Sequence, residues 1–233
     1  MIIALNNKSN LTKQEFIKYQ EQLSNTNTSN KMILCPTFLN ISQFNLSNFS
    51  LGSQDVSATN DGAYTGEISA KDLKSYNVEY AIIGHSERRA YQKESFEEIN
   101  AKIKKLLENN ITPILCVGET KKEKEQNKTK EIIKKELMTA IVNLKNVDKN
   151  KIIIAYEPIW SIGTGIIPNN NEITEVFEYI KTFLPNNKIL YGGSANEENI
   201  TTLKQCNIID GFLLGGISLK PDKLKIFVSK LEK

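Results

Sequence analysis

Short apolar runs recur along this sequence, and the longer stretches between them carry apolar residues at every third or fourth position. Two runs, residues 80–83 and 152–155, are continuous rather than alternating. Continuous apolar runs are typical of strands in a parallel sheet that is covered on both faces. The expected strands are 2–5, 32–35, 49–52, 80–84, 112–117, 152–156, 189–191 and 211–214. This repetition indicates a chain built from successive β-α units.

The segments between the strands have the period of an α-helix. One apolar stripe begins at Phe96 and ends at Leu106, and another begins at Ile133 and ends at Leu144. Steps of three and four residues place each stripe on one helix face. Helices are expected through both stripes and over 12–23, 69–76, 172–184, 196–205 and 222–231, with a shorter helix after Asn40.

About eight β-α units in 233 residues predict an α/β fold, the (β/α)₈ barrel. No linker rich in Pro, Gly or Ser divides the chain, so residues 1–233 are expected to form a single domain. An open, doubly wound sheet is the alternative. That fold favours a glycine-rich turn after its first strand, whereas residues 5–8 (LNNK) contain no glycine. The barrel is therefore favoured.

Composition narrows the classes of function. With 39% hydrophobic residues the chain can form a core, and 30 Lys+Arg against 27 Asp+Glu gives a net charge of +3. The charged run 121–135 mixes both signs, which is typical of a solvated helix and not of a nucleic-acid surface. Three separated cysteines and one histidine argue against a metal site or a disulfide framework. With no membrane span or secretory segment, we expect a cytoplasmic protein that binds neither membrane nor nucleic acid.

Functional groups of a barrel gather where the strands end. Glu157 follows the sixth strand, and a carboxylate that is partly desolvated is a stronger base. Taken alone, Glu157 fits an ion-paired carboxylate equally well. Likewise, Lys8 after the first strand reads as an ordinary surface lysine, and a lone histidine such as His85 is more often structural. Strand ends thus supply candidates without deciding their roles.

Six blocks of sequence lie at or near these strand ends. They are residues 52–57 (GSQDVS), 62–67 (GAYTGE), 83–89 (IGHSERR), 155–165 (AYEPIWSIGTG), 190–194 (LYGGS) and 210–216 (DGFLLGG). In this order they resemble the triosephosphate isomerase family, and the resemblance covers nearly the whole chain. It implies a TIM barrel that interconverts dihydroxyacetone phosphate and D-glyceraldehyde 3-phosphate through an enediol, without cofactor or metal.

The resemblance also implies roles for single residues. Glu157 is the base, His85 the electrophile and Lys8 the electrostatic stabiliser. Residues Ser86-Glu87 suit a helix start, whose positive end favours a neutral imidazole at His85. The remaining implied residues are Asn6, Gly163, Ser194, Gly215 and Gly216 for the substrate and its phosphate, with Glu87 and Tyr191 in support. Glu87 fits a helix-start carboxylate equally well, and Tyr191 a buried aromatic.

Two further implications concern loops. Residues 158–168 resemble a lid whose closure excludes water. The loop that begins at Gly62 and ends at Glu67 resembles the family's dimer loop, so a homodimer is expected; otherwise it is an ordinary turn into a helix.

The chain also departs from the family pattern. Asn7 and Ser9 are polar where packing residues are usual, and Pro168 at the far end of the lid fixes φ and lacks an N–H. Cys116 is expected to be a small buried hydrophobe. Two alternatives stay open: another phosphate-binding barrel enzyme such as a sugar-phosphate epimerase, and a barrel that binds a sugar phosphate without catalysis.

Overall fold

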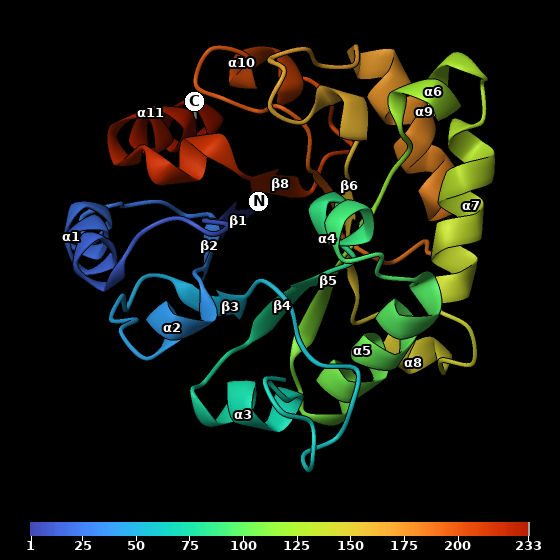
Figure 1. The fold of residues 1–233 in the computed structure, drawn as a ribbon. Helices are drawn as coiled ribbons and strands as arrows, with labels where there is room; N and C mark the ends of the chain where they lie inside the picture. The colour runs from blue at the N-terminus through green and yellow to red at the C-terminus, as the bar shows by residue number, and fades with distance from the viewer. Residues whose placement is uncertain (233) are drawn as a thin grey trace.

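A computed structural model describes residues 1–232, and its eight parallel strands close into a barrel in chain order (Figure 1). Closure occurs where β1 pairs with β8, with Ile3 opposite Phe212. The strands are β1 Ile2–Asn6, β2 Lys31–Cys35, β3 Ser50–Ser53, β4 Tyr80–Ile83, β5 Thr112–Val117, β6 Ile153–Tyr156, β7 Ile189–Tyr191 and β8 Gly211–Leu214. The (β/α)₈ barrel predicted from the sequence is confirmed.

Helices surround the barrel (Figure 1). Several begin at residues whose side chains accept hydrogen bonds from the first turn; Ser95, Thr120 and Asn169, for example, form capping boxes with glutamates three positions on. The helices are α1 Lys13–Leu23, α2 Phe38–Ile41, α3 Ala70–Ser75, α4 Ser86–Tyr91, α5 Phe96–Glu108, α6 Lys121–Glu125, α7 Thr129–Ala140, α8 Asn146–Lys149, α9 Asn170–Lys181, α10 Ile200–Leu203 and α11 Pro221–Glu232, with 3₁₀ turns η1 Ile159–Ser161 and η2 Gly216–Leu219.

Apolar side chains form two clusters, as expected of strands that are covered on both faces. The larger cluster includes Leu5, Ile83 and Phe177 and joins the strands to the helices. The smaller one consists of ten buried strand residues, among them Ile33, Ile114 and Leu190. Side chains from most strands thus fill the barrel interior, so it is a packed core and not a channel.

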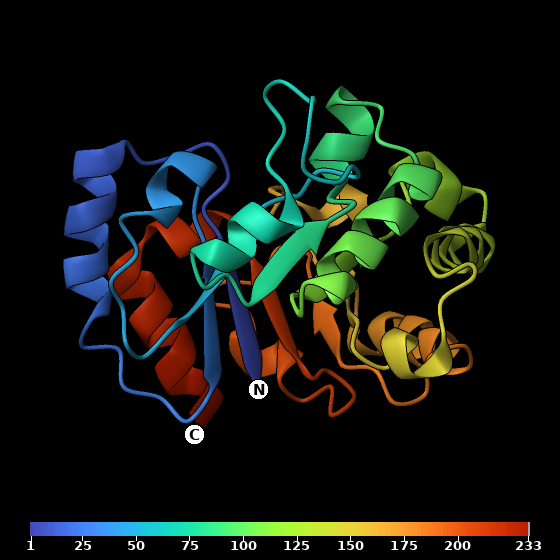
Figure 2. The ribbon, with the colours of Figure 1, turned by 90° about the horizontal axis from the view of Figure 1, so that it is seen from below.

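All strands run in one direction, and the loops that follow them therefore gather at one rim (Figure 2). Each strand begins and ends within one residue of its predicted position. The helices differ more. The apolar stripe that ends at Leu144 predicts one continuous helix, but α7 ends at Ala140 and α8 follows as a separate short helix.

Local backbone conformation explains these differences. The charged run 121–135 is divided between α6 and α7 because Asn127 lies in the left-handed region (φ 56°). The expected helix 196–205 shortens to α10, because the Asn196 side chain accepts the N–H groups of Glu198 and Asn199 in a turn. The short helix expected after Asn40 begins before it, at Phe38.

Candidate active site

Lys8 lies just beyond the end of β1, in a left-handed conformation (φ 51°). Its N–H donates to Asn6 Oδ1 at 3.0 Å, and its carbonyl oxygen accepts from Gln54 Nε2 at 2.9 Å. The ammonium group forms an ion pair with Glu87. Because backbone and side chain are both held, this cation has a fixed place at the rim.

His85 lies two residues after the end of β4 and is the N-cap of α4. The residue is 6% exposed, and its Nδ1 accepts the Glu87 N–H at 3.2 Å. A ring nitrogen that accepts an N–H carries no proton, so the single proton of the neutral ring lies on Nε2. Nε2 lies 3.1 Å from Glu157 Oε1. His85 is therefore arranged to donate a hydrogen bond from Nε2 as a neutral imidazole.

Glu157 follows β6 and is 1% exposed. Its second oxygen, Oε2, accepts the Ser86 N–H at 3.1 Å, so both oxygens have donors. A Cβ at Gly192 would lie 2.9 Å from Glu157 Cγ, and one at Gly118 would lie 1.8 Å from the Glu157 carbonyl oxygen. These two glycines leave the space that the carboxylate and its backbone need.

A cavity of about 540 Å³ opens beside these side chains. It has the size of a site for a small ligand. Glycines in the loops after β6, β7 and β8 allow the backbone to approach an anion closely. The residues predicted for catalysis and substrate binding all line it: Asn6, Lys8, His85, Glu157, Gly163, Ser194, Gly215 and Gly216.

Residues 158–168 cover one side of the cavity. Residues 163–166 are exposed, whereas Pro158 and Pro168 at the two ends are buried. Within this segment Ser161 Oγ donates to the Ile166 carbonyl oxygen at 2.6 Å. At its start, Trp160 Nε1 donates to Glu119 Oε1 at 2.9 Å. The segment thus has an exposed tip between two anchored ends.

The two supporting residues of the prediction lie outside the main cavity. Glu87 lines an adjacent cavity of about 370 Å³, which it shares with Lys8 and His85. Tyr191 is fully buried at the end of β7, with its Oη 3.4 Å from Ser161 Oγ. Burial raises the pKa of the Tyr191 hydroxyl to about 12. It contacts the start of the lid segment as a neutral phenol.

Sequence reasoning missed other residues of the site. Lys220 and Lys223 line the cavity just beyond η2, and their place after the last strand is a signal that could have identified them. Glu119 is 1% exposed and accepts from Tyr156 Oη at 3.1 Å as well as from Trp160. Burial raises the pKa of the Glu119 carboxyl. No spacing in the sequence indicates these contacts.

The departures from the family pattern have distinct structural outcomes. Asn7 is 1% exposed, and its Nδ2 lies 3.4 Å from both Tyr19 Oη and Ser218 Oγ. Asn7 Oδ1 has no hydrogen-bond partner among the described residues. Ser9 is exposed. Cys116 is fully buried, and burial raises the pKa of its thiol, so it has the character of a small buried hydrophobe.

Residues 1–232 contain no group of three or more His, Cys, Asp or Glu side chains arranged to hold a metal ion. Of the helices described there, none is both long enough and apolar enough to cross a membrane.

Fold and site together define a (β/α)₈-barrel enzyme whose groups suit proton transfer on a small anionic substrate. A family model described as triosephosphate isomerase matches residues 1–231. The chain belongs to the triosephosphate isomerase family.

Individual relatives agree with this assignment. The triosephosphate isomerase of Alkaliphilus oremlandii is 38% identical over 95% of this chain and 96% of its own. That of Mesomycoplasma hyorhinis is 46% identical over 79% of this chain and 76% of its own. That of Dictyoglomus thermophilum is 40% identical over 89% of both chains. The epimerase and the non-catalytic barrel are therefore not favoured.

Proposed function

We propose that this chain interconverts dihydroxyacetone phosphate and D-glyceraldehyde 3-phosphate, with Glu157 as the base and His85 as the electrophile. The observation that carries this proposal is the 3.1 Å contact between a buried carboxylate and the protonated nitrogen of a neutral imidazole. A base removes a proton from carbon beside a carbonyl, while a donor polarises the carbonyl oxygen. Both groups line one cavity of suitable size.

The proposed reaction begins with a rearrangement of Glu157. His85 Nε2 has one proton and directs it at Glu157, so a substrate carbonyl oxygen must replace Glu157 there. The freed carboxylate then takes a proton from C1 of dihydroxyacetone phosphate while His85 Nε2 gives its proton to the C2 oxygen, and the enediol forms. Glu157 returns a proton to C2 while His85 takes the proton of the C1 hydroxyl, which gives glyceraldehyde 3-phosphate and restores both groups. Lys8 stabilises the negative charge that develops on oxygen.

The phosphate subsite of the proposal lies in the loops after β6, β7 and β8. Gly163, Ser194, Gly215 and Gly216 line the cavity there, and η2 begins at Gly216. Backbone N–H groups of such loops bind anions well. Residues 158–168 act as a lid in this proposal. Because the lid begins directly after Glu157, its closure moves the base and excludes water together.

The test is a coupled assay of glyceraldehyde 3-phosphate isomerisation with Glu157→Gln. Loss of the base is expected to lower kcat by about 10²–10⁴-fold. Glu178→Gln is the matched control, since Glu178 is exposed on α9. A folded wild-type protein that binds glycerol 3-phosphate but shows no turnover would contradict the proposal.

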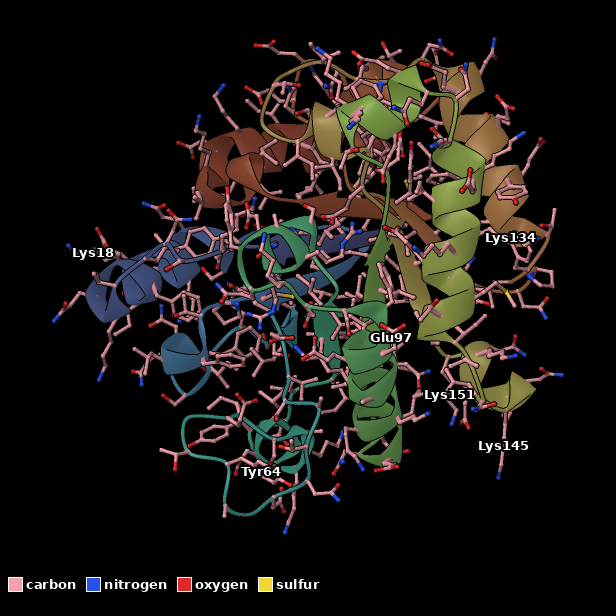
Figure 3. The ribbon with its side chains drawn as sticks, turned by 45° about the vertical axis from the view of Figure 1, so that its right-hand side comes forward. Lys18, Tyr64, Glu97, Lys134, Lys145 and Lys151 are labelled. Atoms are coloured by element: carbon pink, nitrogen blue, oxygen red, sulfur yellow. The ribbon has the colours of Figure 1, made fainter. Side chains whose placement is uncertain are left out.

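We also infer that the chain forms a homodimer through residues 62–67. Figure 3 shows Tyr64 near the lower edge of the molecule, away from the barrel. Tyr64 is 50% exposed and Tyr91 77%, although both are large and apolar. Tyr91 and Phe38 line the adjacent cavity beside Lys8. A loop from a second copy that filled this cavity would cover apolar surface and support the catalytic lysine.

We also propose that residues 1–233 form one domain and that the protein is cytoplasmic. One closed barrel with a shared apolar cluster supports a single domain. Cys35, Cys116 and Cys206 are all free and buried, which suits a reducing compartment.

A further inference from the structure

Lys124 contacts the first part of the lid and the helix that follows the lid. It lies in the short helix α6, in the connection after β5. Its Nζ is 3.8 Å from the centroid of the Trp160 ring and 2.8 Å from Glu172 Oε1. One ammonium group thus contacts an aromatic face and a carboxylate at once.

The two partners of Lys124 stand at opposite ends of the lid in the chain. Trp160 lies in η1, three residues after Glu157. Glu172 lies in the first turn of α9, which begins just after Pro168. Figure 1 shows α6 beside α9. Lys124 therefore connects the beginning of the lid to α9, the helix that follows the end of the lid.

The other hydrogen bonds of Trp160 and Glu172 explain which part of each residue Lys124 contacts. The edge of the Trp160 ring is held by Glu119, so the ring face remains for the cation. Glu172 Oε2 accepts the Asn169 N–H at 2.9 Å, and Oε1 remains for Lys124. The Lys124 side chain is 34% exposed. A cation–π contact that is partly removed from water is stronger than one on an open surface.

We propose that Lys124 is a positioning residue for the isomerisation, which fixes both ends of the lid relative to each other. It contacts neither the cavity lining nor Glu157 and acts through Trp160 and Glu172. With both ends fixed, movement of the lid tip carries Glu157 to one defined place. This inference rests on the proposed role of residues 158–168 as a lid.

The chain offers a matched control for this role. Lys130 on α7 also pairs with a glutamate of α9, Glu175, at 2.6 Å. Lys130 Nζ is 5.7 Å from the centroid of an aromatic ring, that of Tyr179. This second set of contacts has the same chemistry but includes no residue of the lid. It separates an effect on the lid from a general loss of contacts with α9.

The experiment compares Lys124→Met, Lys124→Arg, Glu172→Gln and Lys130→Met. Steady-state kinetics give kcat and KM separately. Trp160 is the only tryptophan, so intrinsic fluorescence during titration with 2-phosphoglycolate reports the lid's first end directly. Thermal unfolding tests whether each variant is folded. Because Gln can still accept the Asn169 N–H, Glu172→Gln removes only the ion pair.

We expect Lys124→Met to lower kcat about tenfold, with KM changed less than about twofold, because a misplaced base affects the transition state more than binding. Its Trp160 fluorescence response to 2-phosphoglycolate is expected to differ from that of the wild type. Lys124→Arg keeps the charge and should restore most activity, whereas Glu172→Gln should show a smaller loss. Lys130→Met is expected to stay within about twofold of wild type in kcat.

Two outcomes contradict the inference in distinguishable ways. If the wild-type fluorescence does not respond to 2-phosphoglycolate while the ligand inhibits, the lid proposal fails and this inference fails with it. If the wild type responds and Lys124→Met matches it in kcat and fluorescence, only the role of Lys124 is wrong. An equal loss of kcat in Lys130→Met would mean that Lys124 acts only as an ordinary contact with α9. If Lys124→Met does not fold, Glu172→Gln decides the matter by the same readouts.

Discussion

At the scale of single residues, the position of Glu157, the proposed base, depends on a neighbouring glycine. Glu157 occupies its place because Gly192 has no Cβ, and a methyl group there would lie 2.9 Å from Glu157 Cγ. That distance is closer than carbon atoms normally approach each other. The same methyl group would lie 3.2 Å from the Tyr156 carbonyl oxygen. Because that oxygen belongs to the backbone, the flexible side chain of Glu157 is the group that would have to move.

Gly192→Ala is therefore expected to displace the base without removing it. A misplacement of about 1 Å can cost about 10²-fold in rate, so kcat should fall by about that factor with little change in KM. Steady-state kinetics test this, with thermal unfolding to confirm that the variant is folded. Activity within about twofold of wild type would mean that Glu157 reaches the substrate from another position.

The sequence alone indicated where this site lies, because Lys8, His85 and Glu157 follow strands whose ends meet at one rim. It did not indicate what holds them. Residues such as Glu119 act from loops, and their contacts depend on how those loops fold. The local pattern of apolar residues indicates which side chains are buried and whether a segment is helix or strand. It does not indicate a contact such as that between Asn7 and Ser218, which lie 211 positions apart in the chain.

At the scale of elements, α4 and α7 are joined by a largely buried ion pair. Arg89 of α4 pairs with Glu136 of α7, and Glu136 Oε2 also accepts the Gly118 N–H at 2.8 Å. Burial raises the pKa of Glu136 to about 7, although Arg89 acts in the opposite direction. The Gly118 loop carries Glu119, so this carboxyl connects two helices to the surroundings of the lid.

This raised pKa predicts how stability changes with pH. Between its ordinary value of 4.5 and about 7, Glu136 keeps a proton in the folded chain that the unfolded chain has released. Its contribution to the free energy of unfolding therefore falls as the pH rises through this range. Glu136→Gln cannot ionise and should show a weaker fall in melting temperature from about pH 5 to about pH 8.

Glu131→Gln is the control for this series, because Glu131 is exposed on the same helix. Melting curves at four or more pH values check the expectation. If Glu136→Gln and wild type have parallel pH profiles, Glu136 does not titrate in this range.

Strands were predicted more accurately than helices for a physical reason. Strands such as β5 are buried on both faces, so their apolar runs begin and end with the strand itself. Helix ends depend on caps and on residues in left-handed conformations. Asn127 and Asn143 (φ 60°) divide an apolar and charged pattern that continues across them. The periodicity of the apolar residues does not show where such residues end a helix.

At the scale of the whole molecule, the proposed dimer can be tested by the mass of the protein in solution. Tyr64→Asp places a charge on the exposed loop and should shift the mass in solution from twice 26.3 kDa to 26.3 kDa. Activity should fall with it, because the adjacent cavity borders Lys8 and His85. Light scattering with size-exclusion chromatography measures the mass.

Tyr76→Asp is the matched control, since Tyr76 is 54% exposed at the end of α3 and lies outside the loop. It is expected to remain dimeric. A wild-type protein that stays at 26.3 kDa at every concentration would refute the dimer.

The pairing of β1 with β8 also has a consequence for synthesis on the ribosome. Lys8 is made 207 residues before Gly215 (215 − 8), yet a Cβ on Gly215 would lie only 3.4 Å from Lys8 Cε. At about 5–20 residues per second, β1 waits roughly 10–40 s for its second neighbour. Until then β1 and β7 each present an open edge to other chains. A growing chain therefore completes the rim that carries Lys8 only when β8 pairs with β1, and the same pairing removes both open edges.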